Sequence, residues 1–582
     1  MPDKSTSDNP DSEKAVSKKA ISEKAQPPAK PRKERDFSFS HRMSEHEALM
    51  WNIEKDPWLN SSGAALTILD KPVDMDLFRR QVRFGVAKIP RLYQRVVPGL
   101  GRLSTPEWVP DAEFNFDYHV REVSLPAPGT ERQLLDLAAT LYEEPMDRTR
   151  PLWRFVAISG LEGGRGALWT LTHHVISDGI GQLRMAELYQ QVSRDEPPKP
   201  DVNLDEVIAE ALKHSSGATA GADLATNFAK TATRSMKFVA RRQGGIARRI
   251  AGELSLWPAD PKRAVEATED VVVAAKSALG QLSGSDKEVR GGSPLWTHRS
   301  RHRQLEHVRV PLDGLKNASK ALGGSINDAF MVGLTEASVR YHSERGAKVE
   351  AFNTSFVLST RSDNKVSGNA FTPVLVQVPG DDVSLSSRMR TIRNIISVAR
   401  DGISSGGGIT GLSGIINLLP TSVVTRTARA QAAKIDFATS NLRGAPFALY
   451  CAGAKVESIV CMGPVAGTAA NITAMSYNGN FEIGLFIDPE AINDPVDYRR
   501  CVEESFAALV AEGSEEKPAV PKKAATKKKA VAKKAPAKKK AVAKKAPAKK
   551  KAVAKKAVAK KAPAKKKAVA KKAPAKKKAA SK

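Results

Sequence analysis

Apolar residues between positions 37 and 200 recur at two spacings, one typical of strands and one typical of helices. Short apolar runs predict buried strands at residues 63–69, 152–159 and 166–175. Helical spacing predicts helices at residues 75–89, 131–144 and 179–195. Short extended pieces are expected at residues 107–111 and 114–120. Because strands and helices alternate, the pattern predicts a mixed α/β domain over residues 37–200.

The same spacings return after residue 300 and predict a second mixed α/β domain over residues 301–512. Strands are expected at residues 307–312, 352–360, 373–379, 458–464, 471–479 and 481–488. Helices are expected at residues 315–323, 326–345 and 495–513. The fold class is therefore α/β, with two mixed-sheet domains.

Residues 201–300 show few strand patterns and several Gly and Ser breaks, so we expect a helical connector between the two domains. Within it, residues 226–242 combine Phe228, Met236 and Phe238 with five Lys and Arg. Two interpretations of this stretch stay open. Its basic amphipathic face lies on an anionic membrane, or the helix packs on a neighbour with its cations in water.

The two ends of the chain differ from the rest in composition. Residues 1–36 are polar and should be disordered, and they lack the apolar run of a secretory signal. Residues 513–582 form a low-complexity tail of Lys, Ala and Pro, in which KKAPAKKKAVA recurs. Residues 517–582 hold 29 of the 92 Lys and Arg, which leaves 63 basic against 63 acidic residues in 1–516. The net charge of +29 therefore belongs to the tail, which argues against a basic nucleic-acid-binding globule.

Cysteine content and hydropathy indicate the cellular compartment in which the protein is expected. The three cysteines cannot form a disulfide framework, and no pair has zinc-finger spacing. No stretch approaches the roughly 18 apolar residues of a spanning helix. We expect a cytoplasmic protein that is not secreted, has no transmembrane helix, and is peripheral to the inner membrane or to lipid droplets.

The segment HHVISDG, residues 173–179, carries the clearest chemistry. If the apolar run before it is a strand, His173 and His174 point to opposite faces, so one of them can enter a cleft. A neutral imidazole near its ordinary pKa can take a proton from an alcohol. Asp178 could anchor the loop, and Gly179 gives the backbone room to turn. A metal site is less favoured, because no further ligands stand at a recognised spacing.

Several blocks together resemble the bacterial wax ester synthase/diacylglycerol acyltransferase family of the HHxxxDG CoA-dependent acyltransferases. They are PMDRTRPLW (145–153), HHVISDG, GGSINDAFMVGL (323–334), SNLRGAP (440–446) and SYNGNFEIGLFID (476–488). The resemblance extends from about residue 43 to residue 510. It implies two chloramphenicol-acetyltransferase-like domains, a helical connector and an active site in a tunnel between the domains.

The resemblance also implies a reaction and residue roles. A long-chain acyl group moves from acyl-CoA, the co-substrate, to the hydroxyl of diacylglycerol or of a long-chain alcohol, giving triacylglycerol or wax esters. His174 would be the general base of a direct attack, His173 a supporting residue and Asp178 the loop anchor. Asn327 would be a polar group near the reacting centre, although Asn327 and Asp328 could equally cap a helix. No bound cofactor or metal is required.

Other residues receive structural interpretations. Cys451 and Cys461 are expected in the core, and His119 is expected to satisfy a local hydrogen bond. A cluster of three arginines could meet CoA phosphates or form a solvated edge: Arg299, Arg301 and Arg303. The chain also departs from the family where SNVPGP is usual, because Leu442 and Arg443 replace Val and Pro. This segment is expected to be a loop that shapes the substrate channel.

The tail has several candidate partners. A run of lysines without acids binds polyanions, so DNA, RNA, polyphosphate or anionic lipid would all serve, although it could also be a solubilising appendage. It contains no aromatic residue to stack on bases. The alternative function is a polyanion- or lipid-droplet-binding protein with a weakly active acyltransferase fold, tethered by this tail.

Overall fold

The computed structural model of the chain describes residues 37–99, 104–215, 292–359, 368–369, 371–404, 416–417 and 420–513. The predictions for residues 1–36 and for the lysine-rich tail lie outside the described residues. So do most of the predicted connector and its basic stretch at 226–242.

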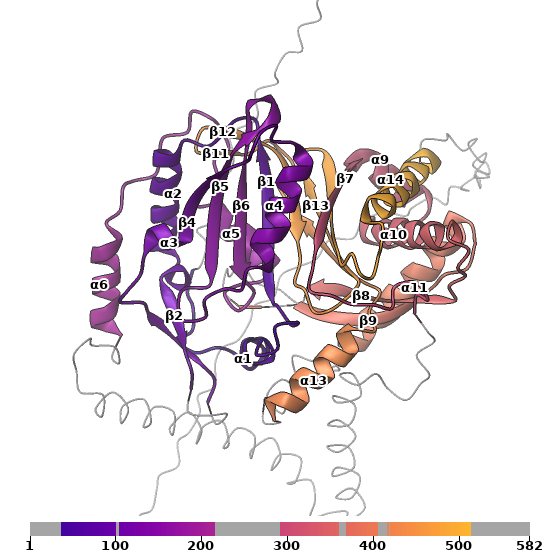
Figure 1. The fold of residues 1–582 in the computed structure, drawn as a ribbon, viewed down its shortest axis with the longest axis horizontal. Coiled ribbons are helices and arrows are strands. Elements are labelled where there is room, and N and C mark those ends of the chain that lie inside the picture. Colours follow the sequence, from indigo (N-terminus) through magenta and orange to yellow (C-terminus); the bar gives the residue numbers. More distant parts are fainter. Residues whose placement is uncertain are drawn as a thin grey trace, which may run out of the picture. The chain divides into compact units, whose positions relative to one another are not determined.

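Two six-stranded mixed sheets form the framework of the protein (Figure 1). The first sheet has, in spatial order, β11 (Tyr450–Cys451), β12 (Ala454–Met462), β1 (Ser62–Leu69), β6 (Arg165–His173), β5 (Trp153–Leu161) and β4 (Val120–Ser124). The second has β7 (Gln304–Pro311), β14 (Asn480–Ile487), β13 (Ala470–Tyr477), β10 (Phe437–Arg443), β8 (Ala351–Ser359) and β9 (Phe371–Pro379). A separate hairpin pairs β2 (Gln94–Val97) with β3 (Glu107–Pro110). The prediction of two mixed α/β domains is therefore confirmed.

Helices pack against each sheet. The helices of the first half are α1 (Glu45–Ile53), α2 (Met75–Lys88), α3 (Phe116–His119), α4 (Glu131–Glu143), α5 (Gly179–Ala186) and α6 (Leu204–His214), with 3-10 turns at Pro90–Leu92 and Glu162–Gly164. Those of the second half are α9 (Leu312–Ala321), α10 (Ile326–Ser343), α11 (Leu385–Ser404), α13 (Thr421–Ala432) and α14 (Pro495–Glu512). Local chemistry sets several of these ends. Asp74 caps α2, and Thr130 with Gln133 forms a capping box for α4.

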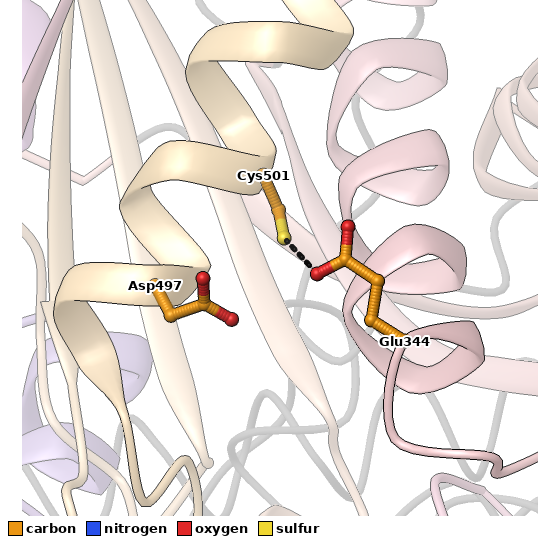
Figure 2. A group of neighbouring side chains, drawn as sticks. All are labelled: Glu344, Asp497 and Cys501. Carbon is orange, nitrogen blue, oxygen red and sulfur yellow. Dashed lines mark hydrogen bonds between the residues drawn. The ribbon is translucent and has the colours of Figure 1, made fainter.

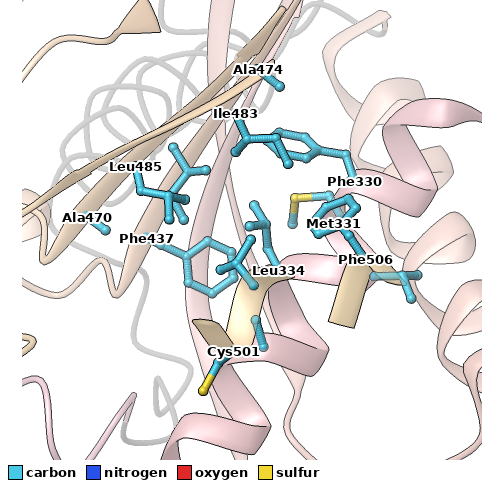
Figure 3. Close-up of a cluster of buried hydrophobic side chains, with 14 of the residues drawn as sticks. Phe330, Met331, Leu334, Phe437, Ala470, Ala474, Ile483, Leu485, Cys501 and Phe506 are labelled. Carbon is cyan, nitrogen blue, oxygen red and sulfur yellow. The ribbon is translucent and has the colours of Figure 1, made fainter. Parts of the chain in front are cut away.

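The core of the second half lies where α10 and α14 pack on the sheet (Figure 3). Phe330 and Leu334 of α10 meet strand residues such as Ile483 there, and all three are buried. The two helices approach closely at Gly333, where an added Cβ would lie 2.6 Å from the ring of Phe506. A larger residue at this position would force α10 and α14 apart.

A hairpin from the C-terminal half completes the first sheet. Strand β12 pairs antiparallel with β1, and the register places Ala64 opposite Met462. Cys451 and Cys461 belong to this hairpin and are buried in the core of the first half, which confirms their structural interpretation. The sequence ranges 37–200 and 301–512 therefore do not coincide with the two sheets.

Polar contacts tie α4 to β7, the edge strand of the second sheet. Arg132 forms an ion pair of 2.5 Å with the buried Glu306. His307 lies 2.7 Å from Glu482 and 3.8 Å from Glu131. Burial lowers the pKa of His307, but hydrogen bonds to these two carboxylates and the charge of Glu482 more than offset burial and the nearby Arg309. The pKa of His307 therefore lies above its ordinary value.

Three predicted elements are wrong in part. The helix expected at 179–195 ends at Ala186, because Gln191 turns its backbone to exchange two 2.8 Å hydrogen bonds with Tyr450 of β11. The extended piece expected at 114–120 contains the helical turn α3, which Asn115 caps. The loop expected at 440–446 begins as strand, since β10 continues to Arg443 in parallel pairing with β13.

Candidate active site

The HHVISDG segment connects a central strand to a helix. Strand β6 ends at His173, residues 174–178 turn, and α5 begins at Gly179. Because β6 lies between β1 and β5, the turn emerges from the middle of the first sheet. The backbone is fixed at this point, since the N–H of His174 donates to the carbonyl of Ser61 at 3.0 Å.

The side chain of His173 is buried and bonded at both ring nitrogens. Its Nδ1 accepts a hydrogen bond of 3.0 Å from the backbone N–H of Val175, so the ring proton lies on Nε2. That nitrogen donates to Glu54 Oε2 at 2.5 Å. Burial raises the pKa of the Glu54 carboxyl, but His173, the backbone N–H of Ser61 and Arg148 outweigh it, so the pKa lies below its ordinary value. His173 thus holds the turn, and its supporting role in the reaction stays a prediction.

His174 points the other way and lines a cavity. Its Nε2 lies beside Gly63 of β1, where an added Cβ would stand only 3.3 Å away. Burial lowers the pKa of His174 to about 4; a proton added to His173 would act in the same direction, while the charges of Asp178 and Glu54 oppose it. The expectation of an imidazole near its ordinary pKa is therefore wrong, because the ring is removed from water. At neutral pH His174 is uncharged and can accept a proton.

Asp178 and Gly179 shape the start of α5. The Asp178 carboxylate caps the helix by accepting the N–H of Gly181 at 2.9 Å. Its role as the anchor of the catalytic loop stays a prediction. Gly179 provides room for a neighbour: a Cβ there would lie 3.0 Å from Leu442 Cδ2 of β10. The glycine thus lets a strand of the second sheet approach the motif.

Asn327 lies outside the cavity lining, and its side chain is exposed. Its Oδ1 accepts a hydrogen bond of 2.5 Å from Asn441 Nδ2, and Asn441 does line the cavity. The cap of α10 is Ser325, which forms a capping box with Asp328, so Asn327 and Asp328 are not a cap pair. Asn327 therefore reaches the cavity only through Asn441.

The cavity beside His174 has a volume of about 270 Å³ and is lined from both sheets. Its first-sheet side is mainly apolar and includes Phe155, Leu168, Met185 and Ile459. Its second-sheet side includes polar residues: Thr439, Ser440, Asn441, Asn471 and Thr473. Leu442 and Ala445 also line it, which places the unusual SNLRGAP segment at the cavity wall. An apolar chain and a polar reacting group can therefore meet next to His174.

One group of side chains in the described part of the chain has the spacing of metal ligands: Glu344, Asp497 and Cys501 (Figure 2). Both carboxylates are already bound by cations, because Arg500 pairs with each of them and Arg345 pairs with Asp497 at 2.8 Å. Burial raises the pKa of the Cys501 thiol to about 12, so it stays protonated. These residues do not fit a metal ion.

The remaining candidates are mostly structural. His119 is buried, lies 2.7 Å from the carbonyl of Trp153 through Nδ1 and stacks on that indole, which confirms its predicted local role. Arg299 donates to backbone carbonyls, including that of Gly467, and the buried Arg303 faces Asp488 at 3.4 Å. Arg299 and Arg303, two of the three arginines suggested to bind CoA phosphates, therefore form contacts within the protein.

Sequence reasoning missed Glu54 and Gly63. Glu54 follows α1, a helix that was not predicted, and stands 119 residues before its partner His173, so no local spacing connects the two. Gly63 looks like any small residue in an apolar strand. Only the pairing of β1 with β6, which places Gly63 opposite Thr172, brings it to the histidine.

Comparison with known proteins identifies the family of the chain. The wax ester synthase/diacylglycerol acyltransferase catalytic domain matches residues 43–330, and the C-terminal domain of the same family matches residues 367–510. A putative diacylglycerol O-acyltransferase of Mycobacterium tuberculosis is 27% identical over 482 residues, covering 81% of this chain and 92% of its own. A probable diacylglycerol O-acyltransferase of the same organism is 25% identical over 463 residues, covering 78% and 92%.

A solved structure has the same fold. The wax ester synthase/diacylglycerol acyltransferase from Marinobacter aquaeolei VT8 aligns with a TM-score of 0.55 at 20% identity, covering 81% of this chain and all of that one. Fold, cavity and family matches together define an acyltransferase. The chain belongs to the wax ester synthase/diacylglycerol acyltransferase family, which implies acyl-CoA as co-substrate and a hydroxyl compound as acceptor. Among the described residues, none of the helices is both long and apolar enough to cross a membrane.

Proposed function

We propose that the protein transfers a long-chain acyl group from acyl-CoA to the hydroxyl of diacylglycerol, of a long-chain alcohol or of both, with His174 as general base. The observation that carries this proposal is the position of a neutral imidazole in the wall of a largely apolar cavity. Such a cavity suits acyl chains, and the polar side chains opposite suit a hydroxyl or an ester group.

The reaction would proceed by direct attack. The acceptor hydroxyl gives its proton to His174 Nε2 as its oxygen bonds to the thioester carbonyl carbon. The tetrahedral oxyanion then collapses, the carbon–sulfur bond breaks, and the CoA thiolate takes the proton from the imidazolium. An imidazolium formed in this buried place is costly, and the charges of Asp178 and Glu54 favour it. No covalent acyl-enzyme is needed.

The test is release of CoA from palmitoyl-CoA in the presence of diacylglycerol or hexadecanol. His174→Ala should lower kcat by about 10²–10⁴-fold, the usual contribution of a general base. His214→Ala is a matched control, because His214 is exposed on α6 and should leave the rate unchanged. Equal rates for wild type and His174→Ala would contradict the mechanism and favour the alternative of a weakly active tethering protein. The ratio of the two acceptors gives the preferred product.

The lysine-rich tail supports a further part of this proposal, namely peripheral contact with an anionic surface. Each basic residue near an anionic membrane contributes about 1 kcal/mol, and residues 517–582 hold 29 lysines. We expect full-length protein to bind anionic vesicles, and a variant ending at residue 516 to bind them less. Binding to duplex DNA, measured in parallel, separates a lipid surface from a nucleic acid. If truncation changes neither binding, the tail has no tethering role.

A further inference from the structure

Two residues from the second half reach across to the HHVISDG turn. Gly368 and Asn369 lie between β8 and β9 of the second sheet. Gly368 forms a parallel bridge with Ser177, and Asn369 Nδ2 donates to the carbonyl oxygen of His174 at 2.6 Å. Gly368 has a φ of +84°, a conformation that favours glycine. The chain can therefore bend so that consecutive residues both contact the motif.

The backbone of His174 is consequently held on both sides. Its N–H donates to Ser61 in the first half, and its carbonyl accepts from Asn369 in the second. These two bonds fix the peptide planes before and after the Cα atom, from which the imidazole projects into the cavity. A small rotation at this point would move Nε2 relative to a substrate hydroxyl.

The amide of Asn369 also influences the carboxylate of Glu47 on α1. Burial raises the pKa of Glu47, and hydrogen bonds from Ser44 and Asn369, together with the charge of Arg91, oppose that rise. An aspartate at position 369 would offer only acceptors when ionised, and would face a carbonyl and a carboxylate.

We propose that Asn369 is a positioning residue, through which the second half of the chain fixes the backbone of His174 and so orients its imidazole. The proposal rests on the proposed function, in which His174 is the general base. Under this proposal, Asn369 affects turnover only through its effect on His174. Asn369 itself does not contact the substrate.

The experiment measures kcat and KM for palmitoyl-CoA with full-length Asn369→Asp and Asn369→Leu, each also in a His174→Ala background. Radiolabelled palmitoyl-CoA makes the low residual rates measurable. Because a misplacement of about 1 Å can cost on the order of 10²-fold, we expect kcat to fall about 10- to 100-fold, with KM within about twofold. In the His174→Ala background the same substitutions should cause no further loss. Asn394→Asp, the same chemical change at an exposed position of α11, should have no effect.

The possible results of this experiment distinguish the proposal from its alternatives. A kcat within about threefold of wild type for both Asn369 variants would overturn the proposal. So would an equal loss in both backgrounds, because the residue would then act on binding or folding rather than through His174. Near-UV circular dichroism and melting temperature identify variants that fail to fold, and Asn369→Ser would then replace them. If His174→Ala alone leaves turnover unchanged, the proposed function fails first.

Discussion

Replacing Gly63 with alanine should reduce activity while leaving the protein as stable or more stable. A Cβ at this position would lie 3.3 Å from His174 Nε2, 3.7 Å from its Cδ2 and 3.8 Å from Gln182 Oε1. The first contact is slightly closer than the usual optimum for carbon atoms, so the ring must shift by a few tenths of an ångström. The methyl group also occupies space next to Nε2, where a hydroxyl must approach to about 2.6–3.2 Å.

The stability effect has the opposite sign. Glycine within a strand is less stable than alanine by roughly 0.5–1 kcal/mol, and a buried methyl adds up to about 0.8 kcal/mol. The tight contact with the imidazole cancels part of this gain. We therefore expect an unchanged or higher melting temperature together with a fall in kcat/KM on the order of 10²-fold.

The assay is CoA release from palmitoyl-CoA with diacylglycerol or hexadecanol, combined with thermal unfolding of the same preparations. Gly85→Ala is the matched control, because Gly85 lies in helix α2 and its nearest neighbour would be 3.9 Å away. It should stabilise the protein by about 1 kcal/mol and leave kcat/KM unchanged. If Gly63→Ala keeps kcat/KM within about threefold of wild type, the acceptor hydroxyl does not approach Nε2 beside β1.

Glu54→Gln should lower the free energy of unfolding by about 1–3 kcal/mol, because one amide oxygen cannot serve both donors that now meet the buried carboxylate. Urea unfolding measures this loss, and a loss below about 0.5 kcal/mol would argue against the Glu54–His173 bond. His307 should make stability pH-dependent, since its pKa is raised in the folded state by Glu131 and Glu482. That stabilisation is complete below the unfolded pKa of about 6.5 and disappears as pH rises through the folded pKa. Melting temperature should therefore fall less from pH 6.5 to pH 9 in His307→Gln than in wild type, and parallel profiles would refute this assignment.

Much of the framework could be predicted because the apolar patterns are strong. Strands β5 and β6 are buried on both faces, and their continuous apolar runs reflect this burial. Helix α2 runs from Met75 to Lys88 and ends just before Pro90, as its apolar spacing and the proline indicated. Strand geometry also suggested that His173 and His174 point in different directions, although β6 ends at His173 and His174 begins the turn.

The rest depends on contacts between distant residues. Helix α1 buries His46 and Glu47, so its inward face is not apolar and helical periodicity could not show it. The end of α5 is set by Tyr450, which lies far along the chain. The low pKa of His174 arises from its burial, which no motif encodes. Contacts between distant residues thus determine the details of the site, while local sequence patterns determine most helices and strands.

The hairpin of β11 and β12 has a consequence for synthesis on the ribosome. Strand β1 is made early, but its neighbour β12 ends at Met462 and emerges only when most of the chain is complete. At about 5–20 residues per second, β1 waits tens of seconds with one edge open and its core unfinished. The first half therefore cannot mature by itself as it is translated. A fragment ending at residue 300 should aggregate or need a chaperone, and adding residues 301–517 in trans should rescue it only during refolding.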